Sequence, residues 1–108
     1  MKDIAQTITR ISGHRGHYCY RSLICVIWLV TGYLPEERHM KDICAEAGAI
    51  CGKSPGATKQ DMSRAVRDIW EHGDRKALVQ LLGRDPLVMP TPKDFVLEVA
   101  QIFWCRTA

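Results

Sequence analysis

The sequence predicts an all-α domain, and three observations support this fold class. Apolar residues recur at helical spacing along most of the chain, no run alternates cleanly between apolar and polar residues, and Gly or Pro separates the periodic segments. The chain has 108 residues, of which 46% are hydrophobic and 25% charged, the balance of a soluble globular domain. We therefore expect residues 1–108 to form a single domain of six helices, too small for a two-domain enzyme.

The first two expected helices differ in how much of their surface is apolar. The first, about residues 3–12, has three isoleucines on one face and is followed by Gly13. The second, about 17–31, is apolar on nearly every side, with Trp28 on its apolar face. Such a helix lies centrally in a fold, and Gly32 is its expected stop.

The next two helices are joined by a short turn. The third, Met40–Cys51, is rich in Ala and is followed by Gly52. The fourth begins after Ser54, a hydroxyl N-cap followed by Pro at the first helical position, and extends to His72. Two helices connected by a short turn that contains Gly are typical of a helix-turn-helix, although many small helical domains contain such a pair.

The last two helices have clear capping signals. The fifth is bounded by Asp74 as N-cap and by Gly83, and a connector at 84–90 follows. The sixth, about 91–106, opens with Thr, Pro and an acid three residues after the Thr, a variant of the capping box. Its apolar residues cover nearly all faces, so besides a core helix it predicts a surface for self-association or a partner.

The excess positive charge lies in the middle of the chain. The formal net charge is +3, and residues 53–84 carry seven basic and four acidic groups. In the fourth helix we expect a buried apolar stripe of Met62, Ala65, Val66, Ile69 and Trp70. The opposite side carries Lys59, Gln60, Ser63, Arg64 and Arg67, with Asp61 as its only acid before Asp68.

This cationic side is suited to nucleic acid, because cations bind phosphates and short polar side chains read base edges. Lys59, Gln60 and Ser63 are expected to face bases, whereas Lys53, Arg64, Arg67 and Lys41 are expected to hold phosphates. The N-terminus of the helix, at Ser54 and Gly56, directs backbone N–H groups at an anion. The alternative is an ordinary solvated polar face.

Several stretches occur in an order and spacing that resemble one known family. They are Gly16-His-Tyr-Cys-Tyr-Arg-Ser-Leu-Ile24, Lys41, Ser54-Pro55, Arg64-Ala65-Val66, Trp70-x-x-Gly73-Asp74, Leu81-Leu82-Gly83 and Pro90-Thr91-x-x-Asp94-Phe95. Over about residues 8–104, the chain resembles the C-terminal DNA-binding effector domain of the master sporulation response regulator (stage-zero sporulation protein A) of spore-forming Firmicutes. The resemblance implies a six-helix transcription factor that binds duplex DNA through its third and fourth helices. It also implies contacts of the later helices with RNA polymerase or a neighbouring domain.

The chain departs from this family at the base-reading positions. Where the family has Arg, Glu, Arg and Arg, this chain has Ala57, Lys59, Gln60 and Ser63. The resemblance therefore carries over the fold and the groove-facing role of these positions, but not the target sequence. The alternative function is a helical interaction module that kept the fold and lost DNA binding, using the sixth helix and the connector at 84–90.

The family's phosphoacceptor receiver domain has no counterpart in these residues. The chain is expected to be either part of a receiver-containing protein or a free-standing domain that phosphorylation does not switch in cis. Met1 favours the second.

Other chemistry has weaker support. His14, His17 and Cys19 with Cys44 and Cys51 suggest zinc, but structural zinc sites usually contain close pairs such as C-x₂-C. The basic residues near His14 and His17, Arg15 and Arg21, are an alternative set of phosphate contacts. No catalytic arrangement or phosphate-binding loop is recognisable, so we expect neither an enzyme nor a cofactor.

The cysteine count and the apolar runs bear on the compartment. Five cysteines without an export signal predict reduced thiols in the cytoplasm. The longest uncharged apolar run, Leu23–Val30, is far shorter than the roughly 20 residues that span a bilayer, so no membrane association is expected.

Overall fold

The computed structural model describes residues 1–107 and confirms the all-α fold class, with six helices and no strand in that range. The helices are α1 (Lys2–Ile11), α2 (Cys19–Tyr33), α3 (Met40–Cys51), α4 (Pro55–His72), α5 (Arg75–Leu82) and α6 (Pro92–Thr107). None of these helices is both long enough and apolar enough to cross a membrane.

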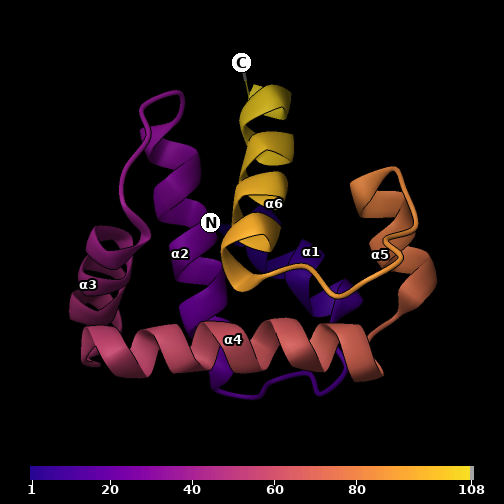
Figure 1. The fold of residues 1–108 in the computed structure, drawn as a ribbon, viewed down its shortest axis with the longest axis horizontal. Coiled ribbons are helices and arrows are strands. Elements are labelled where there is room, and N and C mark those ends of the chain that lie inside the picture. Colours follow the sequence, from indigo (N-terminus) through magenta and orange to yellow (C-terminus); the bar gives the residue numbers. More distant parts are fainter. Residues whose placement is uncertain (108) are drawn as a thin grey trace.

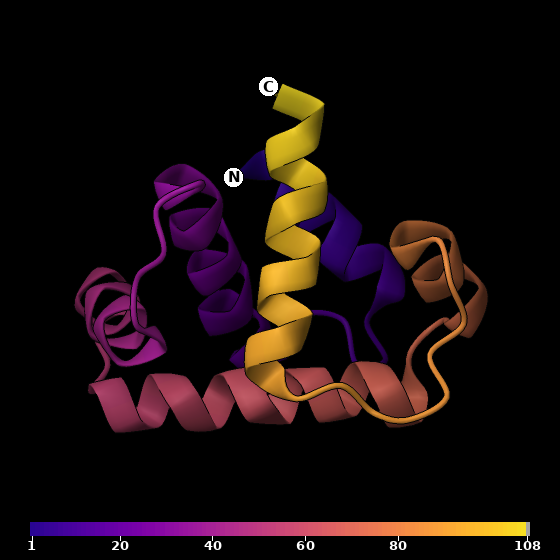
Figure 2. The ribbon, with the colours of Figure 1, turned by 45° about the horizontal axis from the view of Figure 1, so that its top comes forward.

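α4 forms one side of the molecule, and the other five helices lie on its inward side (Figure 1). α2 and α6 pack against each other, and both contact α4. α3 lies at the N-terminal end of α4, whereas α1 and α5 lie toward its other end (Figures 1 and 2). The core lies between these elements and includes Ile8, Leu23, Val26 and Val99, each fully or almost fully buried. As expected, α2 is the most buried element, because apolar residues on several faces meet different neighbours.

Local capping signals set three of the helix starts, as the sequence predicts. The Ser54 hydroxyl accepts a hydrogen bond from the Ala57 N–H at 3.1 Å, and Asp74 caps α5 in the same way. The Thr91 hydroxyl accepts from the Asp94 N–H, also at 3.1 Å. Each bond satisfies a donor that the first helical turn leaves free.

The predicted bounds of the second helix are wrong at both ends. Gly32 does not end α2, which continues to Tyr33. The helix ends instead because Pro35 disfavours helical geometry in the residue before it, and Leu34 is extended with ψ 143°. At the other end, residues 17 and 18 precede the helix. Trp28, expected on the apolar face, is 40% exposed.

The sixth helix has less spare apolar surface than its composition predicts. Its position between α2 and α5 (Figure 2) places five of its apolar side chains in the core. These are Phe95, Val96, Val99, Ala100 and Phe103. Of the described residues, the large apolar side chains with the highest exposure lie instead in the connector, where Leu87 is 95% exposed and Val88 75%.

The turn between α3 and α4 depends on two glycines. Gly52 has φ 72°, a left-handed conformation that suits glycine, and it lets the Lys53 N–H donate to the Gly48 carbonyl at 2.8 Å. Gly48 faces the turn and the first part of α4 at close range. A Cβ at Gly48 would lie 2.5 Å from the Lys53 carbonyl oxygen and 2.9 Å from the Thr58 hydroxyl.

This close approach predicts that Gly48→Ala destabilises the domain by about 2 kcal/mol, because an overpacked helix contact must separate. Gly32→Ala is the matched control, since a Cβ at Gly32 meets nothing within 4 Å and Ala stabilises a helix interior by about 0.5–1 kcal/mol relative to Gly. Urea denaturation measures both. Equal stability of the two variants would contradict the tight α3–α4 contact.

Candidate nucleic-acid interface

The outward side of α4 is polar and cationic. Its inward side buries Met62, Ala65, Val66 and Ile69, as predicted, but Trp70 is only half-buried. The guanidinium of Arg75 lies over the Trp70 ring at 4.1 Å from its centroid. The outward side chains are all exposed and together line one shallow hollow. They are Lys59, Gln60, Ser63, Arg64 and Arg67.

Asp61 is not on this exposed side, contrary to the sequence expectation. It is 5% exposed, because its carboxylate accepts a hydrogen bond from the Ser22 hydroxyl at 3.2 Å and pairs with the Lys53 ammonium. A buried carboxylate requires such partners to offset its lost hydration. The hollow therefore contains no acidic side chain.

The same ion pair changes the expected role of Lys53. Its side chain is 30% exposed, and its ammonium lies 4.6 Å from the centroid of the Tyr18 ring as well as against Asp61. The sequence predicts a phosphate contact for Lys53, whereas in the structure its ammonium pairs with the Asp61 carboxylate. Lys59 and Arg67, in contrast, form no ion pair with any residue in the described part of the chain.

The remaining predicted residues divide into two groups. Ser54 and Gly56 are exposed at the N-terminal end of α4, a few residues before Lys59, the first residue that lines the hollow. The Ser54 hydroxyl already accepts a hydrogen bond as the helix cap. Lys41 is exposed near the start of α3, at the end of that helix away from α4. At 1.5 Å per residue, it lies about 15 Å along α3 from the turn, and the structure does not bring it to the hollow.

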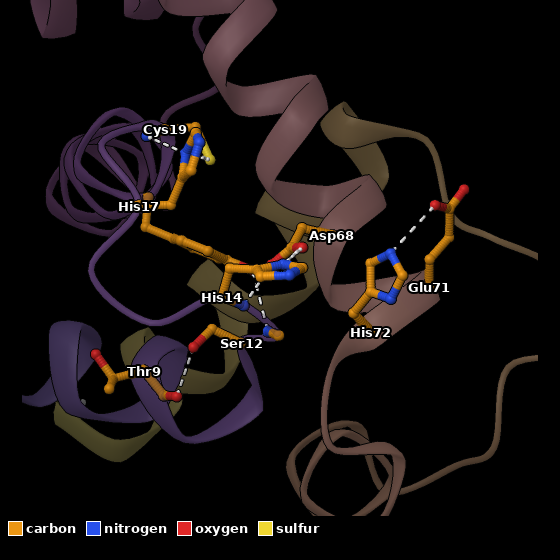
Figure 3. Close-up of polar contacts among 10 residues, drawn as sticks. Thr9, Ser12, His14, His17, Cys19, Asp68, Glu71 and His72 are labelled. Atoms are coloured by element: carbon orange, nitrogen blue, oxygen red, sulfur yellow. Dashed lines mark hydrogen bonds and ion pairs between the residues drawn. The ribbon is translucent and has the colours of Figure 1, made fainter.

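The segment between α1 and α2 contacts α4, an arrangement that the sequence does not predict. The Asp68 carboxylate accepts hydrogen bonds from the His14 backbone N–H at 2.9 Å, from the His14 imidazole and from the Tyr20 hydroxyl; Figure 3 shows the His14 contacts. One helical turn earlier, Arg64 Nη1 donates to the Tyr18 hydroxyl at 2.6 Å. These pairs are 46–54 residues apart, so no local pattern indicates them.

The histidines and cysteines of this segment do not gather into a metal site. The His14 imidazole binds Asp68, whereas His17 Nδ1 lies 3.0 Å from Cys19 Sγ (Figure 3). Cys44 lies buried in α3. Among the described residues, no three His, Cys, Asp or Glu side chains are grouped so that they could hold a metal ion.

Comparison of the chain with protein-family models, curated proteins and solved structures gives no match.

The contacts of Asp68 predict a measurable effect of pH on stability. Burial opposes ionisation, but the hydrogen bonds from Tyr20 and His14 outweigh it and lower the pKa of Asp68 to about 2. Because an unfolded Asp titrates near pH 3.9, this stabilisation is complete above pH 5 and is lost as the pH falls toward 2.

Asp68→Asn is accordingly expected to cost about 2 kcal/mol at pH 7, the size of hydrogen bonds to a charged group. Denaturation of both proteins between pH 7 and pH 2 measures the difference in their free energies of unfolding. That difference should shrink below pH 4. A constant difference over the whole range would mean that Asp68 ionisation does not stabilise the fold.

Proposed function

We propose that this domain binds duplex DNA as a helix-turn-helix, with α4 in the major groove, and acts as a transcriptional regulator. The observation that supports this most is the outward side of α4, where five exposed polar or cationic side chains line one hollow without an acid. The major groove admits an α-helix, and cations that form no internal ion pair are available to phosphates.

The two kinds of side chain suggest two roles in binding. Arg67 and Arg64 carry the charge that phosphates require. Lys59 lies in the N-terminal half of α4, where side chains of a recognition helix face bases. Gln60 and Ser63 are short or forked hydrogen-bonding groups, which suit base edges. Gly56, whose missing side chain leaves open space, permits close approach of the helix N-terminus to the DNA backbone.

The regulatory part of the proposal depends on the resemblance to the sporulation-regulator effector domain. In that interpretation α3 crosses the DNA backbone while α4 reads the groove. RNA polymerase is then a proposed partner of the later helices. The free thiols of the five cysteines agree with action in a reducing compartment such as the cytoplasm.

The two roles predict different effects of substitution. Arg67→Ala should weaken binding to every duplex alike and lower the slope of log affinity against log salt by about one. Gln60→Ala should instead change the preferred sequence, which selection from a random duplex pool followed by fluorescence anisotropy measures. Neither substitution should affect folding, because both side chains are exposed.

Lys2→Ala is the charge-matched control, since Lys2 is exposed at the far end of α1. It removes one positive charge and should leave the salt slope unchanged. If Arg67→Ala and Lys2→Ala have equal effects, binding depends on net charge and not on α4. Unchanged affinity of both α4 variants on every duplex would refute the proposed interface.

The exposed connector supports a second candidate function, a helical protein-interaction module. Leu87 and Val88 are the most exposed large apolar side chains of the described residues, and apolar side chains in the centre of an interface supply much of its stability. Gel filtration with and without a random duplex separates the candidates. Self-association that Leu87→Ser abolishes, without a salt-sensitive shift on DNA, would favour this module over DNA binding.

A further inference from the structure

Tyr18 lies at the edge of the α4 hollow and contacts two of the cations beside it. Arg64 Nη1 donates to its hydroxyl at 2.6 Å, and the Lys53 ammonium lies 4.6 Å from its ring centroid. The His17 ring stacks on it at 4.5 Å between centroids. Tyr18 remains 51% exposed, so these contacts hold it at the surface and not in the core.

Arg64 bonds to Tyr18 and not to the neighbouring acid of α4. Arg64 and Asp68 are four residues apart on α4, a spacing at which Arg and Asp side chains commonly pair. Asp68 instead accepts hydrogen bonds from His14 and Tyr20, and no Arg64–Asp68 ion pair forms in the described residues. His14, in the segment between α1 and α2, and Tyr20, at the start of α2, thus occupy Asp68. Tyr18 provides a neutral acceptor for Arg64.

A neutral partner has a specific advantage for an arginine that binds phosphate. A carboxylate would compete with phosphate for the guanidinium charge, whereas a phenol hydroxyl leaves that charge uncompensated. One bond to Tyr18 uses one of the five N–H donors of Arg64 and leaves four for a ligand. It also restricts the side chain before binding, which lowers the entropy cost of association.

We propose that Tyr18 is a positioning residue of the DNA interface, which orients Arg64 toward a phosphate of the duplex. This inference rests on the proposed function, since it assigns Tyr18 a part in the same interface. Tyr18 acts through Arg64, so its hydroxyl should matter only while Arg64 is present.

Tyr18→Phe tests this, because it removes the hydroxyl and keeps the ring that contacts His17 and Lys53. On a random-sequence duplex at low salt, its affinity should fall about 3- to 10-fold, the cost of ordering one long side chain. In the Arg64→Ala background the same change should cost less than about twofold, because coupled residues are not additive. The melting temperature should stay within about 2 °C of the wild type.

Tyr33→Phe is the matched control. The Tyr33 hydroxyl donates to Glu46 of α3 at 2.5 Å, away from the α4 hollow, so its removal should leave duplex affinity unchanged. Wild-type affinity of Tyr18→Phe, or an equal loss with and without Arg64, would overturn the inference while the proposed function stands.

A measurement without DNA distinguishes the positioning role of Tyr18 from the proposed DNA-binding function. The heteronuclear NOE of the Arg64 Nε–H group reports the order of that side chain, and Tyr18→Phe should lower it in the free protein. A wild-type protein with an ordered Arg64 but no salt-sensitive duplex binding would overturn the proposed function and, with it, the role of Tyr18 on DNA. An equally ordered Arg64 in both proteins would overturn the positioning role itself.

Discussion

The contact between α2 and α4 determines which side chains of α4 are exposed on the surface of the molecule. Burial of Met62, Val66 and Ile69 fixes the rotation of α4 about its axis, because a helix with one apolar stripe has one favourable orientation. Two polar contacts to α2 fix it further, from Ser22 to Asp61 and from Tyr20 to Asp68. With this rotation fixed, the cationic side of α4 must face outward.

The outward charge of α4 results from how the fold uses the acids. The helix contains three basic residues and three acidic ones apart from its histidine, so its net charge alone does not predict a cationic surface. Asp61 is neutralised by Lys53, and Asp68 is held by His14 and Tyr20. Two of the three acids are thereby withdrawn from the exposed side, and the positive charges remain there.

The helix starts can be predicted because local capping residues determine them. Part of the candidate site cannot, because its contacts join residues far apart in the sequence. Ser54, Asp74 and Thr91 act through bonds within three residues, so their caps can be read from sequence. The C-terminal bound of α2 predicted from Gly32 is wrong, because the helix continues until the residues just before Pro35. The burial of Asp61 depends on Ser22, 39 residues away, and the contact of Tyr18 with Arg64 spans 46, so neither follows from helical periodicity.

The side chains that hold α4 in place are largely separate from those that it exposes. Gly48, Asp61 and Asp68 contact other elements. In the described residues, by contrast, no hydrogen bond or ion pair joins Lys59, Gln60 or Ser63 to a distant element. Exposed substitutions of this kind change stability by only about 0.5 kcal/mol. The outward side can therefore change without loss of the fold.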